Sequence, residues 1–221
     1  MSSNDKHPLT QVSIRSSEEL TEGFFLISFK RTFDFLAGQV IGITLRENDA
    51  RRLYSICSGE KEDEVRILYK MVDEGYLTPQ LSDLGPGDTI WITPPGGEFT
   101  GTPEPAVWIA TGTGIAPYYS MLHSGFGKNK TLIHGSRYLE QFHFYDEFHE
   151  KMGDNYIRCC SAESNPEVYS GRVSAYLEEQ PELDPALKYY LCGSADMVVE
   201  TRDLLISKGI PFHHIISEIY F

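Results

Sequence analysis

The chain has 221 residues, enough for one large domain or two small ones, and its 41% hydrophobic and 23% charged residues are ordinary for a globular protein. Its 32 acidic and 19 basic residues give a formal charge of −13, which argues against nucleic acid as a partner. The N-terminus has no apolar stretch like that of a signal peptide, and no apolar run approaches a membrane span. We therefore expect a cytoplasmic protein without a membrane span.

The first hundred residues are typical of antiparallel β-structure. Short strand-like runs separated by Gly, Pro and Asn-Asp turn signals are expected over residues 12–15, 24–29, 40–45, 52–57, 65–72 and 89–93. Strands at this spacing favour a small antiparallel barrel. One short helix is expected over 78–84, with Thr78 as its N-cap and Pro79 at the first helical position.

From residue 106 onward, strands alternate with helices. Strands are expected over 106–110, 131–134, 156–160, 188–192 and 213–220, and helices over 117–123, 140–151, 172–179 and 195–207. This alternation predicts βαβ units and a parallel, Rossmann-like sheet. A Pro-rich stretch at 103–105 marks the boundary, so we expect one domain over 1–101 and a second over 102–221.

The four cysteines, Cys57, Cys159, Cys160 and Cys192, are too few and too scattered for a disulfide framework. They also lack the paired spacing of a zinc site and the tight clusters of an iron–sulfur centre. We expect free thiols at least at Cys57, Cys159 and Cys160, and no metal site.

The strongest local signal in the second half is Gly112-Thr113-Gly114, which follows a buried strand and opens a helix. Glycines at such a turn let the backbone approach a ligand closely, and the free N–H groups at the helix start can receive a pyrophosphate. The third glycine of the usual dinucleotide motif is missing, so a simple strand-to-helix turn is the alternative.

Five short motifs follow one another in a recognisable order: Arg52-Leu53-Tyr54-Ser55, Gly75-Tyr76-Leu77-Thr78, Gly112-Thr113-Gly114, Cys192-Gly193 and Glu218-Ile219-Tyr220-Phe221. From about Gln11 to Phe221, the chain resembles the ferredoxin–NADP+ reductase family, in particular its bacterial flavodoxin/ferredoxin reductases. The resemblance implies an N-terminal FAD-binding β-barrel followed by an NAD(P)-binding α/β domain. It also implies hydride transfer between NADP(H) and FAD, and exchange of single electrons with ferredoxin or flavodoxin by a monomer.

The resemblance assigns flavin-binding roles to the first two motifs. Arg52 is expected to pair with the FAD pyrophosphate, since a guanidinium makes planar, bidentate phosphate contacts. Leu53 belongs to the same cofactor-binding strand, Tyr54 is expected to lie against the isoalloxazine, and the Ser55 hydroxyl to lie near flavin N5. The remaining flavin contacts are expected from the backbone of Leu68, Tyr69 and Lys70 and from the pyrophosphate-binding segment with Gly75, Leu77 and Thr78.

The other motifs concern the nicotinamide nucleotide. Thr113 and Gly114 are expected to bind it, and Cys192 to lie against the nicotinamide ring. By the same resemblance Glu218 assists proton or partner coupling. Tyr220 covers a flavin face and moves aside for the nicotinamide, with Phe221 as an additional terminal residue.

Nucleotide choice depends on a separate group of residues. Arg137, Ser161 and Arg172 match contacts to the 2′-phosphate of NADPH in the bacterial reductases, where arginines and hydroxyls hold the phosphate. At the next position the family's arginine is replaced by Ala162. We expect NADP(H), with NAD(H) possible.

Two other functions stay open. One is an NADH-dependent reductase that feeds an oxygenase or reduces free flavin, and the other is a non-enzymatic flavin-binding subunit of an electron-transfer complex. Ferredoxins and flavodoxins are acidic, so a carrier of this kind calls for a basic patch on an otherwise acidic surface. The available cations are Lys30, Arg31, Arg51, Lys128, Lys130 and Lys151.

Overall fold

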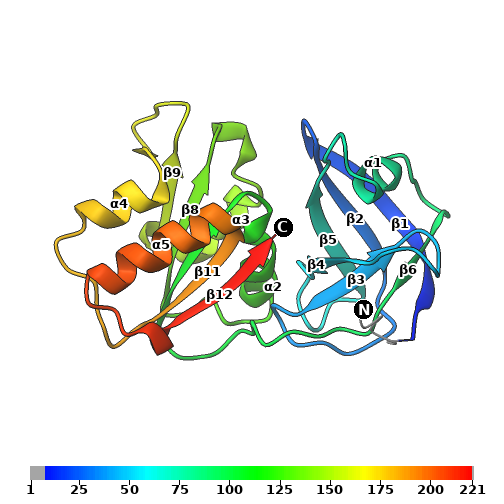
Figure 1. The fold of residues 1–221 in the computed structure, drawn as a ribbon, viewed down its shortest axis with the longest axis horizontal. Coiled ribbons are helices and arrows are strands. Elements are labelled where there is room, and N and C mark those ends of the chain that lie inside the picture. The colour runs from blue at the N-terminus through cyan, green and yellow to red at the C-terminus, as the bar shows by residue number, and fades with distance from the viewer. Residues whose placement is uncertain (1–7, 221) are drawn as a thin grey trace, which may run out of the picture. The chain divides into compact units, whose positions relative to one another are not determined.

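The computed structural model describes residues 8–220, apart from the side chain of Tyr220. The chain divides into two compact units, Met1–Thr100 and Gly101–Phe221. The first is β-structure with one short helix, and the second alternates strands and helices (Figure 1). The expected fold class, an antiparallel barrel-like sheet followed by a parallel-sheet unit, is confirmed.

The first unit is one six-stranded antiparallel sheet that curls until its edge strands meet. Its strands, in the spatial order β4-β3-β6-β1-β2-β5, are β1 (Thr10–Thr21), β2 (Phe24–Lys30), β3 (Val40–Thr44), β4 (Arg52–Ser55), β5 (Glu64–Lys70) and β6 (Thr89–Ile92). The edge strands β4 and β5 meet where Ile56 and Ile67 form a bridge. The N–H of Cys57 also donates to the C=O of Arg66 at 2.9 Å. The curled sheet encloses an apolar core because alternate strand side chains, such as Val65, Ile67 and Tyr69 of β5, face inward.

The short helix of this unit, α1 (Leu77–Ser82), differs from the expected one. Tyr76 is the residue before the helix, so Thr78 is the second helical residue and the prediction of Thr78 as N-cap is wrong. The Thr78 hydroxyl oxygen accepts instead from the N–H of Val72 at 2.9 Å. The tight turn before the helix brings Val72 within reach of this hydroxyl, and that turn is not visible in helix propensities.

The second unit is a six-stranded parallel sheet with helices on both faces (Figure 1). In spatial order the strands are β10 (Tyr169–Ser170), β9 (Tyr156–Cys160), β8 (Lys130–Ser136), β7 (Ala106–Thr111), β11 (Lys188–Ser194) and β12 (Ile215–Tyr220). The helices are α2 (Ala116–His123), α3 (Tyr145–Met152), α4 (Val173–Glu179) and α5 (Ala195–Ser207), with 3₁₀ turns at Gly112–Ile115, Leu139–Gln141, Gly153–Asn155 and Phe212–His214.

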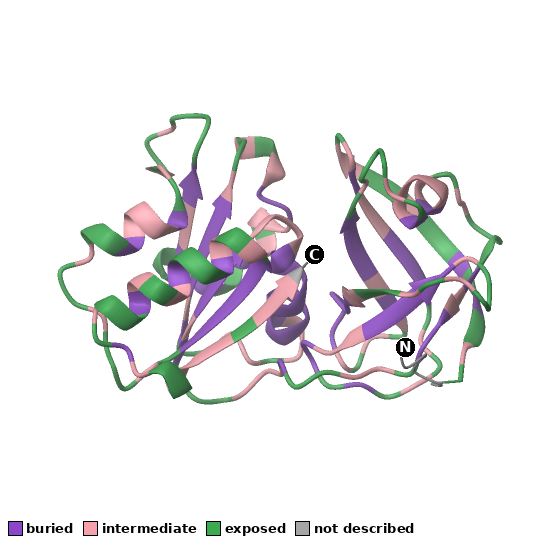
Figure 2. Cartoon of the chain, viewed as in Figure 1, coloured by how far each residue is buried: buried purple, intermediate pink, exposed green. Residues whose placement is uncertain are grey.

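Alternate residues of the central strands pack against different helices. Ile109, Ile133 and Leu191 belong to the core that also contains side chains of α4 and α5. On the other face the Trp108 ring stacks on Tyr118 of α2, with centroids 5.3 Å apart. The central strands are accordingly buried along most of their length, whereas α4 and α5 are exposed on their outer sides (Figure 2). Burial on both faces is typical of parallel sheets.

Two elements of this unit differ from the sequence-based expectation. The helix expected over 140–151 begins only at Tyr145, because Phe144 has a left-handed backbone with φ 64°. The Phe144 ring stacks on Tyr119 with centroids 3.8 Å apart, and this packing accounts for an unusual conformation of a bulky residue. The two-residue strand β10 was not expected, since so short a segment shows no alternation.

Across residues 8–220, no helix has both the length and the apolar character that crossing a membrane requires. All four cysteines are free and buried. The same part of the chain contains no group of three or more His, Cys, Asp or Glu side chains arranged to hold a metal ion.

Candidate functional site

The first group of site residues lies where the edge strands β4 and β5 meet. Tyr54 of β4 makes an edge-to-face contact with Tyr69 of β5, with ring centroids 6.2 Å apart. Burial raises the pKa of Tyr54 to about 12 and also raises the pKa of Tyr69, so both phenols are neutral near pH 7. The Tyr69 hydroxyl is buried and has no hydrogen-bond partner among the described residues. Closure of the sheet thus brings together two residues that the sequence assigns to the flavin.

The remaining residues of β4 differ sharply in exposure. Arg52 is exposed and Leu53 is 68% exposed, whereas Ser55 is 2% exposed. An exposed leucine next to an exposed guanidinium on an edge strand suits a ligand with both an apolar and an anionic part. The Ser55 side chain is buried, so its hydroxyl is not on the exposed surface that Arg52 and Leu53 form.

The backbone of β5 is available on the side toward β4. Arg66 accepts from the N–H of Cys57 and donates its own N–H to the Ser58 hydroxyl at 3.1 Å. Because backbone groups alternate along an antiparallel strand, Leu68 and Lys70 present theirs on this same side. Tyr69 pairs with Phe25 of β2 and directs its backbone groups toward that strand. Lys70 therefore has its backbone groups on the side toward β4, whereas Tyr69, whose backbone was expected to donate, directs its backbone groups toward β2 and its side chain into the core.

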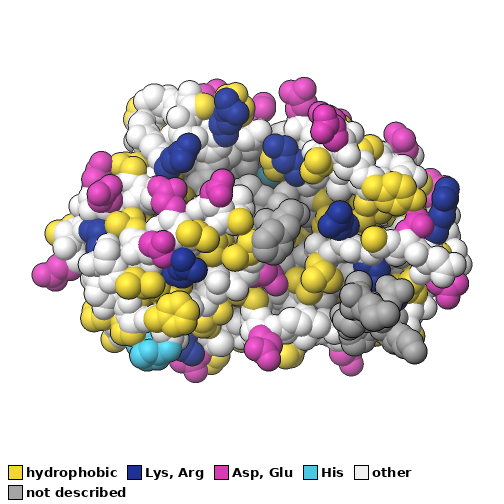
Figure 3. Space-filling model, viewed as in Figure 1, with side chains coloured by type: hydrophobic (Ala, Val, Ile, Leu, Met, Phe, Trp, Pro, Cys, Tyr) yellow, Lys and Arg dark blue, Asp and Glu magenta, His cyan; other side chains and the backbone are white. Residues whose placement is uncertain are grey.

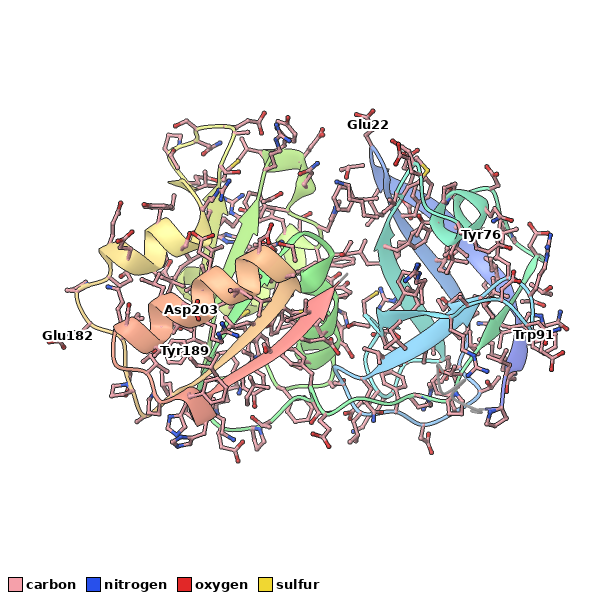
Figure 4. The ribbon with its side chains drawn as sticks, in the orientation of Figure 1. Glu22, Tyr76, Trp91, Glu182, Tyr189 and Asp203 are labelled. Atoms are coloured by element: carbon pink, nitrogen blue, oxygen red, sulfur yellow. The ribbon has the colours of Figure 1, made fainter. Side chains whose placement is uncertain are left out.

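The turn before α1 holds the next predicted residues. A β-carbon at Gly75 would lie 2.9 Å from the carbonyl oxygen of Val72, which also accepts from the Gly75 N–H at 2.7 Å. Only glycine fits this turn. Leu77 is buried and anchors the helix start. The neighbouring Tyr76 is exposed (Figure 4), and its hydroxyl donates to Asp49 at 2.8 Å.

In the second unit the strand order reverses between β7 and β11. From β7 the chain builds outward to β10 and then returns to place β11 on the other side of β7. In open α/β sheets, ligands bind at such a switch point, outside the carboxyl ends of the strands. The Gly112-Thr113-Gly114 turn follows β7 here, and Gly112 has φ 55°, which favours glycine.

The turn touches the end of β11 directly. A β-carbon at Gly114 would lie 2.2 Å from the carbonyl oxygen of Cys192. A β-carbon at Gly193 would lie 2.3 Å from the Thr111 hydroxyl oxygen. The two strand ends therefore approach so closely that neither glycine can be replaced without movement. The sequence analysis did not predict that Thr111 and Gly193 contact each other. Gly193, directly after Cys192, is nevertheless a signal that another backbone segment approaches closely at this position.

Cys192 and Glu218 occupy neighbouring positions in the sheet. Cys192 is fully buried in β11 and is paired in register with Glu218 of β12, which is half-buried. Beneath them, the Tyr118 hydroxyl of α2 donates to the carbonyl oxygens of Ile109 (3.1 Å) and Tyr190 (2.8 Å). Burial, followed by the proximity of Cys192, raises the pKa of Tyr118, so this hydroxyl remains a neutral donor.

The predicted terminal aromatics are not fully described. Tyr220 ends β12 in register with Ser194, but its side chain lies outside the described part of the structure. Phe221 lies outside the described residues altogether.

The three residues predicted to hold a 2′-phosphate converge at the carboxyl edge of the sheet. Arg137 follows β8, and its C=O accepts from the N–H of Ala162 at 3.0 Å. The N–H of Ser161 donates to the C=O of Ser136 at 3.1 Å. Arg172 precedes α4, directly after Gly171, whose N–H donates to Cys160 at the end of β9. The fold thus brings together three segments that are separated in sequence.

The arginines at these sites differ from most others in the chain. The guanidinium groups that have carboxylate partners belong to Arg15, Arg31, Arg66, Arg158 and Arg202. Arg52, Arg137 and Arg172 are exposed and have no carboxylate partner within residues 8–220. Arg172 borders a groove between α4 and α5 that also contains Glu178 and Glu200. The Arg137 guanidinium lies over the ring of Tyr138, 5.4 Å from its centroid. Guanidinium groups without a carboxylate partner fit the phosphates of FAD and of a dinucleotide.

Comparison with known proteins follows the same division of the chain. Residues 8–100 match the model of the oxidoreductase FAD-binding domain, and residues 108–203 match that of the oxidoreductase NAD-binding domain. Ferredoxin–NADP reductase B of Sorangium cellulosum is 30% identical over 220 residues, covering 88% of this chain and 90% of that protein.

Two further similarities extend this comparison. The toluate 1,2-dioxygenase electron transfer component of Pseudomonas putida is 26% identical, covering 90% of this chain and 64% of that protein. The crystal structure of a ferredoxin NADP+ reductase from Neisseria gonorrhoeae with bound FAD and NADP has the same fold. The two structures superpose with a TM-score of 0.86 at 23% sequence identity. The match covers 96% of this chain and 99% of the Neisseria gonorrhoeae chain.

Proposed function

The chain belongs to the ferredoxin–NADP reductase family, and from this membership we propose that it transfers hydride between NADP(H) and FAD and exchanges single electrons with a ferredoxin or flavodoxin. The observation that carries the proposal is the set of exposed arginines, Arg52, Arg137 and Arg172. Each stands at an expected phosphate position without a carboxylate partner among the described residues. Unpaired cations at these positions favour two phosphate-containing ligands over an apolar or cationic substrate.

In the barrel unit, the residues at the meeting of β4 and β5 would hold FAD. Arg52 and Thr78 bind its pyrophosphate, Leu53 covers apolar surface, and Tyr54 offers a neutral aromatic face to the ring. Leu68 and Lys70 donate or accept backbone hydrogen bonds at the ring edge, and Ser55 places a hydroxyl near the reacting nitrogen. FAD supplies the chemistry itself, since it accepts a hydride as two electrons and releases them singly.

In the second unit, the switch point between β7 and β11 would hold the nicotinamide nucleotide. Thr113 and Gly114 bind the pyrophosphate through backbone N–H groups, and Cys192 packs against the nicotinamide ring. Glu218 lies beside Cys192, where a half-buried carboxylate can hold or release a proton. Arg137, Ser161 and Arg172 bind the 2′-phosphate of NADP(H).

The carrier would meet a surface on which basic side chains are dispersed and two of the six expected docking cations are engaged elsewhere. On the face shown in Figure 3, acidic side chains lie over both units, with Lys and Arg side chains scattered among them. Of the six cations available from the sequence, Lys130 is 3% exposed and donates to the carbonyl oxygens of Thr102 and Glu104, so it is not part of a docking patch. Arg31 is paired with Asp34. A small or weakly charged docking surface therefore suits this chain better than a broad basic one.

A second function, an NADH-dependent reductase that delivers electrons to an oxygenase, is favoured by one feature. Ala162 leaves the 2′-phosphate position with one arginine fewer than the bacterial reductases have. The similarity to the toluate 1,2-dioxygenase component is compatible with this alternative.

Anaerobic reduction of the bound flavin by NADPH and by NADH would test both functions. We expect bleaching that is faster with NADPH. We also expect that Arg137→Ala and Arg172→Ala each raise the KM for NADPH about tenfold or more and leave that for NADH almost unchanged. Arg202→Ala is the matched control, because Arg202 is a surface arginine paired with Asp203.

The other outcomes are equally informative. Faster bleaching with NADH would establish NADH as the preferred donor and favour the second function, and a reduction assay with an oxygenase component would then test the delivery of electrons. Absence of bleaching by either nucleotide in the flavin-loaded protein would refute both functions and leave a flavin-binding subunit.

A further inference from the structure

The Tyr118 hydroxyl joins the two central strands of the parallel sheet shortly before the switch point. Tyr118 lies in α2 and is fully buried. Its hydroxyl donates to the carbonyl oxygen of Ile109 in β7 at 3.1 Å and to that of Tyr190 in β11 at 2.8 Å. Because a hydroxyl has one proton, the two carbonyl oxygens share it in a three-centre hydrogen bond. One side chain therefore connects the strands on either side of the switch point.

Packing fixes the position of the Tyr118 ring. The ring stacks on Trp108, with centroids 5.3 Å apart and an angle of 30° between the planes. Trp108 is itself 1% exposed, and the Lys130 ammonium lies over its ring, 5.7 Å from the centroid. A close-packed interior leaves a stacked aromatic side chain little room for another rotamer. The hydroxyl is thus directed toward the two carbonyl groups.

Tyr118 also closes a loop that contains the nucleotide-binding turn. The chain leaves β7, forms the 3₁₀ turn Gly112–Ile115 and enters α2, in which Tyr118 is the third residue. From there the hydroxyl returns to both strands, and it reaches β11 at Tyr190, two residues before Cys192. The segment that follows the turn is therefore attached to the strand before the turn and to the strand beside it.

The spacing that this connection holds is tight. A β-carbon at Gly114 would lie 2.2 Å from the carbonyl oxygen of Cys192, so the backbone of the turn is in direct contact with the end of β11. Cys192 lies on the face of the sheet that α2 covers, since Ile109 and Leu191 face the opposite helices. Tyr118 and Cys192 are also close enough to interact electrostatically. The hydroxyl thus acts beside the residue that ends β11 at the switch point.

We propose that Tyr118 is a positioning residue for hydride transfer, acting through the spacing between the Gly112-Thr113-Gly114 turn and the Cys192 end of β11. This inference rests on the proposed function, which assigns the pyrophosphate to the turn and the nicotinamide ring to Cys192. Because the pyrophosphate and the ring belong to one molecule, the spacing of the two segments determines where the ring lies. Tyr118 itself touches neither group.

Tyr118→Phe tests the proposal, because it removes only the hydroxyl and keeps the ring that stacks on Trp108. The FAD-loaded protein would be mixed anaerobically with increasing concentrations of NADPH in a stopped-flow instrument. The limiting rate of flavin bleaching should fall about tenfold, since a displacement of about 1 Å can lower a rate about 100-fold and the loss of one hydroxyl should cause a smaller one. The NADPH concentration that gives half the limiting rate should change less than about twofold, because the phosphate contacts are retained.

Hydrogen exchange provides a second readout that needs neither nucleotide nor turnover. Amide exchange in the FAD-loaded protein would be followed by mass spectrometry. In Tyr118→Phe, peptides covering residues 109–114 and 190–194 should exchange about fivefold faster or more, because local opening of the strand ends costs less free energy without the three-centre bond. Peptides from α4 and α5 should exchange as in the wild type.

Tyr189→Phe is the matched control. Tyr189 lies in β11, is 1% exposed, and donates its hydroxyl to the carbonyl oxygen of Asp184 at 3.1 Å. The substitution removes the same group from the same strand, but near the start of the strand and away from the switch point. It should leave the limiting rate unchanged, together with the exchange of residues 109–114.

Each other outcome overturns the inference. A wild-type limiting rate in Tyr118→Phe would show that the ring position does not depend on the hydroxyl, whether or not exchange becomes faster. A slower rate with unchanged exchange would place the effect outside the strand ends, and equal losses of rate in Tyr118→Phe and Tyr189→Phe would attribute it to general destabilisation. If the flavin-loaded wild type is bleached by neither NADPH nor NADH, the proposed function fails and the inference fails with it. Rapid bleaching of the wild type identifies a failure of the inference alone.

Discussion

Replacing Gly114 with alanine should disturb the nucleotide site at its closest internal contact. The added β-carbon would lie 2.2 Å from the carbonyl oxygen of Cys192 and 2.8 Å from the nitrogen of Gly193. Ordinary contact begins near 3.4 Å, so the turn and the end of β11 would have to separate by about 1.2 Å. All the atoms involved belong to the backbone, so no flexible side chain can absorb the change.

The size of the effect follows from this displacement. Overpacking of a dense interior costs about 1–3 kcal/mol, which should lower the thermal midpoint of the protein by several degrees. A misplacement of about 1 Å between reacting groups can reduce a rate about 100-fold. We therefore expect Gly114→Ala to bind FAD normally but to be reduced by NADPH about 100-fold more slowly.

Stopped-flow measurement of flavin bleaching, together with thermal unfolding, would test this prediction. Gly209→Ala is the control: Gly209 has φ 90° but no atom within 4 Å of an added β-carbon, so it should lose stability and keep a normal rate of reduction. Wild-type stability and a wild-type rate in Gly114→Ala would refute the close approach. Equal loss of rate in both variants would show that general destabilisation, and not the geometry of the turn, is responsible.

Two further predictions concern acid stability and flavin binding. Burial holds the pKa of His134 at about 3, below its ordinary value of 6.5, so the folded protein keeps it neutral while the unfolded chain gains a proton as the pH falls. The contribution of His134 to the free energy of unfolding is complete above about pH 6.5, and about 2 kcal/mol of it should be lost by pH 5. In urea unfolding, the free energy of unfolding should therefore depend less on pH in His134→Gln than in wild type. An equal pH dependence in the two proteins would contradict this. Arg52→Ala should weaken FAD binding to the apoprotein by about 10- to 100-fold in a fluorescence titration. Arg15→Ala is the control, because it removes an arginine paired with Glu64, and it should leave FAD binding unchanged. Equal effects of the two substitutions would show that Arg52 does not bind the phosphates.

Regular elements with strong local signals were predicted well. The helix expected over 195–207 is α5 (Ala195–Ser207), whose N-cap Ser194 accepts from the N–H of Met197. The start of α3 was predicted five residues too early, because the stacking of Phe144 on Tyr119 fixes a left-handed residue within the expected helix. A contact between distant segments overrode local propensity in that case, as it did where Thr78 binds Val72 instead of capping its helix.

The sequence by itself determined the two-part fold class and the order of the motifs, because periodicity, turn residues and short motifs are local properties. It also identified the residue types suited to flavin and nucleotide, such as Arg52 and Arg137. Only the tertiary structure decided which of these residues meet. The contact of Gly114 with Cys192, the pairing of Ala162 with Arg137 and the bond from Leu139 to Glu163 each join segments that come from different strands. Such contacts depend on strand order and register, which arise when the sheet closes around its core and which no local pattern contains.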